Sequence, residues 1–133
     1  MNELTAKELM IGDYVIRKNV PKEILTIDAI DSIRNTVYLD LDGLGITEKL
    51  ENIEPIPLTT EILEKNGFVK SKNGDVILDE KLGTSEIYLV LVPTFYEEYY
   101  WWTVNNELTA KIKSIHELQH ILKLVGIEKE IKL

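Results

Sequence analysis

Hydrophobic and polar residues alternate over short stretches in the first 57 positions, which is the spacing of β-strands. Val37, Leu39 and Leu41 fall on one face of such a stretch, and Asp42-Gly43 then predicts a tight turn. The predicted strands are residues 14–16, 23–27 and 36–41, with a last short strand beginning at Ile53. Strands of this number and length favour a small barrel or curled sheet of SH3-like size.

The remainder of the chain mixes helical and strand patterns. Thr59 is a good N-cap for a short helix to about Asn66, with Gly67 as its stop. Asn73-Gly74 predicts a hairpin turn, and a longer helix is predicted from Ser114 to about Val125. The predicted strands are residues 68–69, 76–78, 87–92, 99–104 and 108–112, and the alternating tail 127–133 is expected to add an edge strand.

A stiff stretch, Pro55-Ile56-Pro57, marks the predicted boundary between the two parts, because each proline fixes its own φ and restricts the preceding residue. The expected domains are residues 1–57 and 58–133, or one compact domain built from both. The fold class predicted is α+β. It consists of a small N-terminal β unit packed on a C-terminal antiparallel sheet with one main helix.

Composition and charge exclude several kinds of protein. The chain has 133 residues, a formal net charge of −8 and no cysteine. Disulfide scaffolds, cysteine-ligated metals and thiol nucleophiles are therefore excluded, and binding to a phosphate backbone is disfavoured. The first residues carry no basic segment followed by an apolar run, and no apolar run is long enough to span a bilayer. We expect a cytoplasmic protein that binds neither membranes nor nucleic acid.

The sequence His116-Glu117-Leu118-Gln119-His120 matches the H-E-x-x-H motif of zinc hydrolases. On a helix both imidazoles reach one metal ion, and the glutamate acts as general base on the bound water. Here the imidazoles lie nearly opposite the apolar arc of the predicted helix, so we expect them to point into water. Glu117 also completes a predicted capping box with Ser114, and no third ligand is evident. We therefore expect no catalytic residue, metal or cofactor, and a zinc-dependent hydrolase using His116, Glu117 and His120 remains the alternative.

Residues 40–51 resemble a calcium-binding loop. Asp40, Asp42 and Glu51 stand at ligand positions, but Leu44 occupies a position that requires an oxygen ligand. A strand pattern precedes the loop, where a calcium-binding EF-hand requires a helix. The expectation is an acidic turn between strands.

Aromatic residues are concentrated in one region: seven of the ten in the chain lie within residues 88–102. On a strand, Tyr99 and Trp101 face one way, and Tyr100 and Trp102 face the other. We expect both faces to be buried within the domain, and the alternative is an exposed interaction surface, for which Tyr100 and Trp102 are the candidates. Base stacking is disfavoured because no Lys or Arg occurs within this region to hold phosphates.

Three segments of the chain resemble those of a known group of proteins. They are Leu9–Val15 with the form L-x-I-G-D-x-V, residues 55–68 with the form P-I-P-L-T-x-x-x-L-x-x-x-G-F, and Ile115–Gln119, which reads I-H-E-L-Q where the family pattern is V-H-x-L-Q-N. Together they are similar to a family of small uncharacterised proteins from prophages and mobile elements of gut bacteria. The resemblance implies a genomic setting rather than a chemical activity. In that pattern asparagine usually stands at the place of His120.

The function expected from the sequence is therefore that of a non-enzymatic accessory or interaction protein of a prophage or mobile element. Its expected partner is an unidentified protein or a second copy of the chain. Besides the zinc hydrolase, a further alternative is an acidic inhibitor that imitates DNA, which the net charge of −8 suggests.

Overall fold

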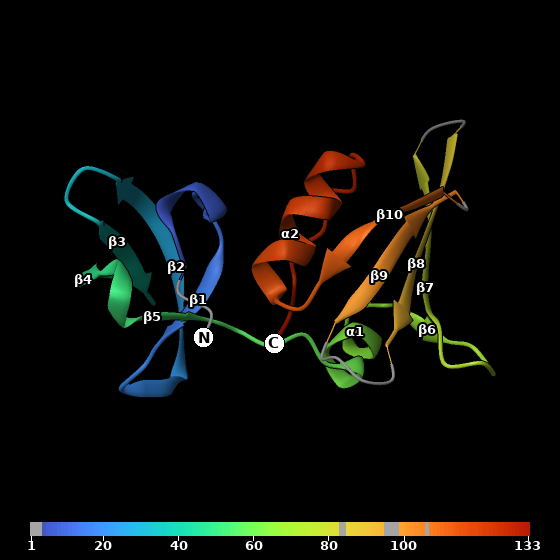
Figure 1. Ribbon diagram of the computed structural model, residues 1–133, viewed down its shortest axis with the longest axis horizontal. Helices are drawn as coiled ribbons and strands as arrows, with labels where there is room; N and C mark the ends of the chain where they lie inside the picture. The colour runs from blue at the N-terminus through green and yellow to red at the C-terminus, as the bar shows by residue number, and fades with distance from the viewer. Residues whose placement is uncertain (1–3, 83–84, 95–98, 106) are drawn as a thin grey trace. The chain divides into compact units, whose positions relative to one another are not determined.

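The protein folds into two compact units, Met1–Ile56 and Pro57–Leu133 (Figure 1). The computed structural model describes residues 4–82, 85–94, 99–105 and 107–133. Each unit contains a five-stranded antiparallel sheet, and the second unit adds one main helix and one short helix. The α+β class predicted from the sequence is confirmed.

The first unit is almost entirely β-structure. Its elements are the 3-10 helix η1 (Ala6–Glu8), β1 (Tyr14–Arg17), β2 (Val20–Asp31), β3 (Thr36–Leu41), β4 (Leu44–Lys49), the 3-10 helix η2 (Leu50–Asn52) and β5 (Ile53–Pro55). The strand order is β4-β3-β2-β1-β5. Strands β1 to β4 thus pair with their neighbours in the sequence, and β5 returns to pair antiparallel with β1.

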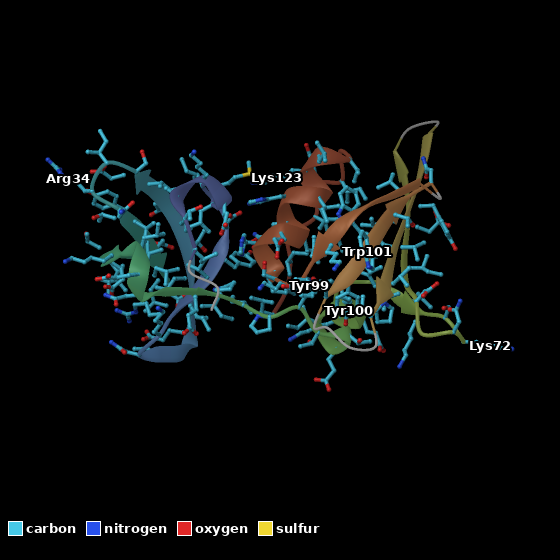
Figure 2. All side chains as sticks on the ribbon, viewed as in Figure 1. Arg34, Lys72, Tyr99, Tyr100, Trp101 and Lys123 are labelled. Atoms are coloured by element: carbon cyan, nitrogen blue, oxygen red, sulfur yellow. The ribbon has the colours of Figure 1, made fainter. Side chains whose placement is uncertain are left out.

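Polar side chains shape the tight turns of this sheet. At the turn between β2 and β3, which carries Arg34 (Figure 2), Asp31 Oδ1 accepts hydrogen bonds from the backbone N–H groups of Ile33 and Arg34, both at 3.1 Å. At the next turn Asp42 and Gly43 have φ of 49° and 89°, the left-handed geometry of a tight hairpin. Residues 40–51 are thus a hairpin followed by η2, and the expected acidic turn between strands is present.

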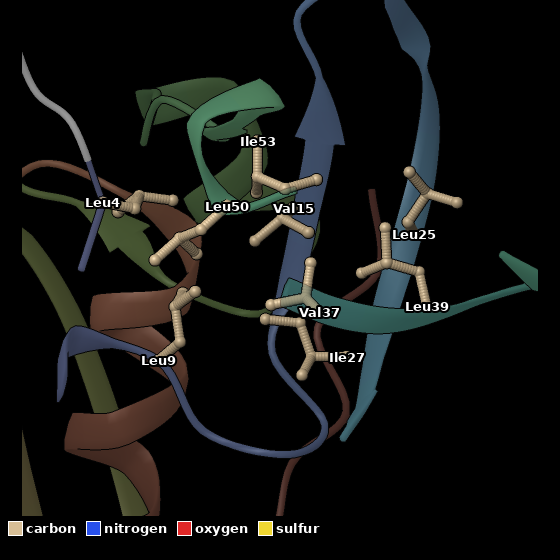
Figure 3. Packing of buried hydrophobic residues seen from close by; sticks show 9 residues of the cluster. All are labelled: Leu4, Leu9, Val15, Leu25, Ile27, Val37, Leu39, Leu50 and Ile53. Carbon is tan, nitrogen blue, oxygen red and sulfur yellow. The ribbon is translucent and has the colours of Figure 1, made fainter. Parts of the chain in front are cut away.

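The core of the first unit comes from alternate positions of these strands (Figure 3). Its buried members are Leu4, Leu9, Val15, Leu25, Ile27, Val37, Leu39, Leu50 and Ile53. Val15, Leu25 and Val37 are fully buried, because side chains at every second position of a strand share one face. The N-terminal segment contributes Leu4 and Leu9 to the same cluster.

The second unit combines a sheet with two helices. Its elements are α1 (Thr60–Lys65), β6 (Val69–Lys70), β7 (Val76–Leu82), β8 (Ser85–Pro93), β9 (Tyr100–Val104), β10 (Glu107–Ile112) and α2 (Ile115–Leu124). The strand order is β10-β9-β8-β7-β6, so β10 and β6 form the two edges. Among the described residues, no helix has the length and apolar character needed to cross a membrane.

Both helices end where the sequence predicts, in a motif that satisfies the last carbonyl groups. After α1, the N–H of Phe68 donates to Leu63 O at 3.0 Å and that of Gly67 donates to Glu64 O at 3.2 Å. This pair of bonds is a Schellman motif, and it requires a left-handed residue, which Gly67 supplies with φ +91°. The end of α2 repeats the arrangement around Gly126, with φ 84°.

Replacing Gly67 with alanine is expected to lower the free energy of unfolding by about 1 kcal/mol, because a side chain disfavours left-handed backbone. The added Cβ would meet its nearest atom, Lys129 Nζ, at 3.4 Å, so the cost comes from the backbone rather than from a clash. Gly45 in β4 is the control, since a Cβ there meets nothing within 4 Å. Denaturant unfolding of Gly67→Ala and Gly45→Ala measures both effects, and equal stability of the two variants would contradict the prediction.

The C-terminal tail is held by a side chain rather than by a sheet. Asn66, only 4% exposed, donates from Nδ2 to Ile62 O at 2.7 Å and to Lys132 O at 2.8 Å. Its Oδ1 accepts from Lys132 N at 2.7 Å. The tail buries Ile127 and Ile131. The expectation of an edge strand over 127–133 is therefore wrong, because the amide of Asn66 takes the place of a neighbouring strand.

Candidate functional site

Tyr99 and the three aromatic residues of β9 divide between the two faces of the second sheet. Tyr100 and Trp102 are buried, at 9% and 8% exposure, and the Tyr100 hydroxyl lies 3.1 Å from Thr60 Oγ1 at the start of α1. They share this face with Leu91 of β8, which pairs with Trp102. Tyr100 and Trp102 therefore do not form the alternative, an exposed surface: they complete the core of the second unit.

The opposite face carries Tyr99 and Trp101, which are both partly exposed. The strand register places Trp101 directly opposite Val92 of β8 on one side and Lys111 of β10 on the other. Residues opposite each other in antiparallel strands point to the same face. Val92 and Lys111 therefore flank Trp101 on this less buried side of the sheet.

Two lysines lie over these rings. Lys111 Nζ is 5.2 Å from the centroid of the Trp101 ring and 5.6 Å from that of Tyr99. Lys113 Nζ is 5.2 Å from the centroid of Tyr99. These distances are typical of cation–π interactions, and each such interaction contributes about 0.5–1 kcal/mol at an exposed site. We call Tyr99, Trp101, Lys111 and Lys113 the aromatic–lysine cluster; Figure 2 labels its two aromatic members.

The sequence alone did not reveal this cluster, because its two halves come from different strands. The aromatic stretch itself contains no basic residue, and the lysines follow it by about ten positions. The information needed to locate the lysines is the register of the β9–β10 hairpin, in which Lys111 pairs with Trp101 and Ile112 with Tyr100. Once that register is known, the alternation of side chains places Lys111 and Lys113 on the side of Tyr99 and Trp101.

The H-E-x-x-H segment lies on α2 as predicted, but its environment differs from the expectation. His116 is only 3% exposed, and its Nδ1 lies 3.2 Å from Ser114 Oγ. His120 is partly exposed, and the two rings meet edge to face with centroids 5.7 Å apart. The expectation that both imidazoles point into water is therefore wrong for His116.

Glu117 has a local role at the start of the helix. Its Oε1 accepts hydrogen bonds from Ser114 Oγ at 2.7 Å and from the backbone N–H of Lys113 at 3.2 Å. The predicted capping box has a different geometry, because Ser114 donates to Glu117 instead of accepting from the helix backbone. In the described part of the chain, no group of three His, Asp or Glu side chains is placed to hold a metal ion. Glu117 thus stabilises the start of α2 through these hydrogen bonds.

Each unit also has an open depression that is lined by other residues. One in the first unit, of about 460 Å³, lies beside Arg34, Lys49 and Glu51. One in the second unit, of about 380 Å³, is lined by the tail and the end of α1. Each mixes lysine or arginine with glutamate, so neither gathers charge of one sign for a particular ligand.

Comparison with known proteins gives no further guide to the site. No family model, no curated protein and no solved structure matches the chain.

Proposed function

We propose that this chain is a non-enzymatic interaction protein, and that it binds its partner through the aromatic–lysine cluster. The observation that carries the proposal is the pair of partly exposed rings, Tyr99 and Trp101, beneath the ammonium groups of Lys111 and Lys113. The resemblance to prophage and mobile-element proteins suggests the setting in which such an accessory protein acts.

The chemistry of the cluster suits recognition of another protein. Tryptophan and tyrosine supply large contact areas and lose little side-chain entropy on binding, which is why they dominate binding energies at interfaces. Trp101 stands on β9, and Tyr99 directly precedes that strand, so the position of the Trp101 ring is fixed before a partner arrives. The lysines place positive charge over these rings, which favours an acidic partner.

Replacing Trp101 with alanine is expected to weaken partner binding about tenfold, the size of effect typical of a central aromatic contact. The measurement is quantitative affinity capture from bacterial lysate, with the wild type and the variant compared protein by protein. Val69→Ala is the matched control, because Val69 is 67% exposed on β6 at the other edge of the same sheet. Proteins that Trp101→Ala loses and Val69→Ala retains are the partners. Identical recovery with both variants would contradict the proposal.

A further inference from the structure

We infer that β4, an edge strand of the first unit, pairs antiparallel with β4 of a second copy of this chain. The pairing is two-fold symmetric, with Ile46 opposite Ile46 of the other copy and Gly45 opposite Thr47. This inference concerns the first unit and does not depend on the aromatic–lysine cluster. Three features of β4 support it: its open backbone groups, an exposed apolar side chain, and opposite charges at its two ends.

β4 lies at the edge of its sheet, where β3 is its one described neighbour (Figure 1). All six residues of Leu44–Lys49 pair with β3 without a shift in register. Edge strands are commonly protected by a proline or a bulge, because an open edge is a template for a further strand. β4 contains neither, so it keeps the regular geometry that the addition of a strand requires.

The hairpin that joins β3 to β4 shows which backbone groups of β4 face outward. Its turn, 42–43, has two residues, so Leu41 and Leu44 form the hydrogen-bonded pair that closes it. Beyond the end of the strand, the N–H of Leu50 donates to Asn35 O at 2.8 Å. Both positions agree with the alternation of backbone groups along a strand. The even-numbered residues of β4 face β3, and the odd-numbered residues face away from it.

Gly45 and Thr47 are the odd-numbered residues whose backbone groups are open. Neither has a hydrogen bond outside the β3 ladder to any residue that the structure describes. Lys49 is already engaged, because its N–H donates to Glu48 Oε1 at 3.2 Å. Pairing Gly45 with Thr47 of the other copy, twice by symmetry, uses all of the open groups, because each such pair exchanges both of its N–H···O bonds.

An exposed leucine at the start of β4 offers apolar surface for the second copy to cover. Leu44 is 64% exposed, while Ile46 is partly exposed and packs against the core of the first unit. Both share the core face of the sheet with Leu39, which pairs with Ile46. In the two-fold arrangement Ile46 meets Ile46 of the other copy, and Leu44 lies diagonally beside it. The apolar row of one core thus continues into the other.

The charges of β4 suit antiparallel pairing of this strand with itself. Asp40 and Asp42 lie at its hairpin end, and Lys49 lies at the opposite end. Among the described residues none of the three has an ion pair. Antiparallel pairing brings Lys49 of one copy beside the hairpin end of the other, where Gly43 and Gly45 have no side chain to separate the charges. A Cβ at either glycine would meet nothing within 4 Å, so lysine and carboxylate attract across open space.

The remaining charges limit the strength of this dimer. Glu48 lies opposite Leu44 of the second copy, and its carboxylate accepts from Asn52 Nδ2 at 2.9 Å within its own chain. The formal net charge of −8 repels two copies over a longer range, but salt at about 0.1 M screens that repulsion beyond about 10 Å. We therefore expect a reversible dimer that forms at high protein concentration, as is typical of a small interface.

Sedimentation equilibrium of the full chain over a range of concentrations measures the dimer. Thr47→Pro removes an outward N–H, which an edge strand tolerates, and is expected to weaken dimerisation at least about tenfold. Circular dichroism at low concentration shows whether this variant is folded. A wild-type chain that stays monomeric at every concentration, or a folded Thr47→Pro variant that dimerises as the wild type does, would overturn the inference.

Charge variants test the same interface without a change to the backbone. Lys49→Asp is expected to weaken dimerisation about tenfold, because it reverses a charge contact at both ends of the interface. Adding Asp40→Lys restores an attraction and is expected to recover most of this loss. Lys72→Asp, at the exposed turn between β6 and β7 (Figure 2), changes the net charge equally and is expected to leave the dimer unchanged. Equal weakening by Lys49→Asp and Lys72→Asp, or no recovery in the double variant, would refute the pairing.

Discussion

Replacing Trp102 with alanine is expected to lower the free energy of unfolding by about 4 kcal/mol, because it empties a large buried site. Replacing its neighbour Trp101 is expected to cost only about 1 kcal/mol, the loss of a partly exposed contact and one cation–π pair. The difference follows from the alternation along β9, where Trp102 is 8% exposed and faces Leu91, whereas Trp101 faces Val92 and Lys111. Denaturant unfolding of the two variants measures both values.

Fluorescence quenching provides a second test of the burial of Trp101 and Trp102, since these are the two tryptophans of the chain. In Trp101→Phe the remaining indole, that of Trp102, is expected to be shielded from the quencher acrylamide. In Trp102→Phe the remaining indole of Trp101 is expected to be quenched more strongly. If the two tryptophans proved equal in both stability cost and quenching, the assignment of faces would be wrong, and with it the surface on which the proposed function depends.

Local signals in the sequence predicted most of the second unit. These signals determine the backbone conformation of adjacent residues only. They are Thr59 at the start of α1, Gly67 and Gly126 at the helix ends, and Asn73-Gly74 at a hairpin. The period-two pattern of residues 99–102 correctly separated the rings into two faces. It did not identify the buried face, because burial depends on which side the helices cover, and that is decided by tertiary packing.

The features that the sequence did not predict depend on contacts between distant residues. β4 was missed because Leu44–Lys49 combines a glycine with charged residues, and its strand conformation is fixed by pairing with β3. His116 was expected in solvent because the helical wheel considers one helix alone, whereas the folded chain leaves it 3% exposed. The aromatic–lysine cluster required the register of β10 against β9.

The C-terminal tail also depends on a contact between distant residues, that of Asn66 with Lys132. Its loss is the second large effect on stability that we expect. Asn66→Asp is expected to lower the free energy of unfolding by about 3 kcal/mol, since it removes hydrogen bonds from buried partners. The carboxylate keeps an acceptor for the N–H of Lys132, but it loses both donations from Nδ2. It then places negative charge against the carbonyl oxygens of Ile62 and Lys132, which adds a repulsion to the lost bonds.

The same substitution elsewhere in the second unit separates this effect from a general cost of added charge. Asn73 is exposed, and its Oδ1 accepts from the N–H of Asp75 and from Ser71 Oγ, so an aspartate retains both interactions. Asn73→Asp is therefore expected to change stability by less than about 0.5 kcal/mol. Hydrogen exchange should also report faster exchange at Lys132 in Asn66→Asp alone. If both variants are equally stable, the tail is held by burial of Ile127 and Ile131 rather than by the amide of Asn66.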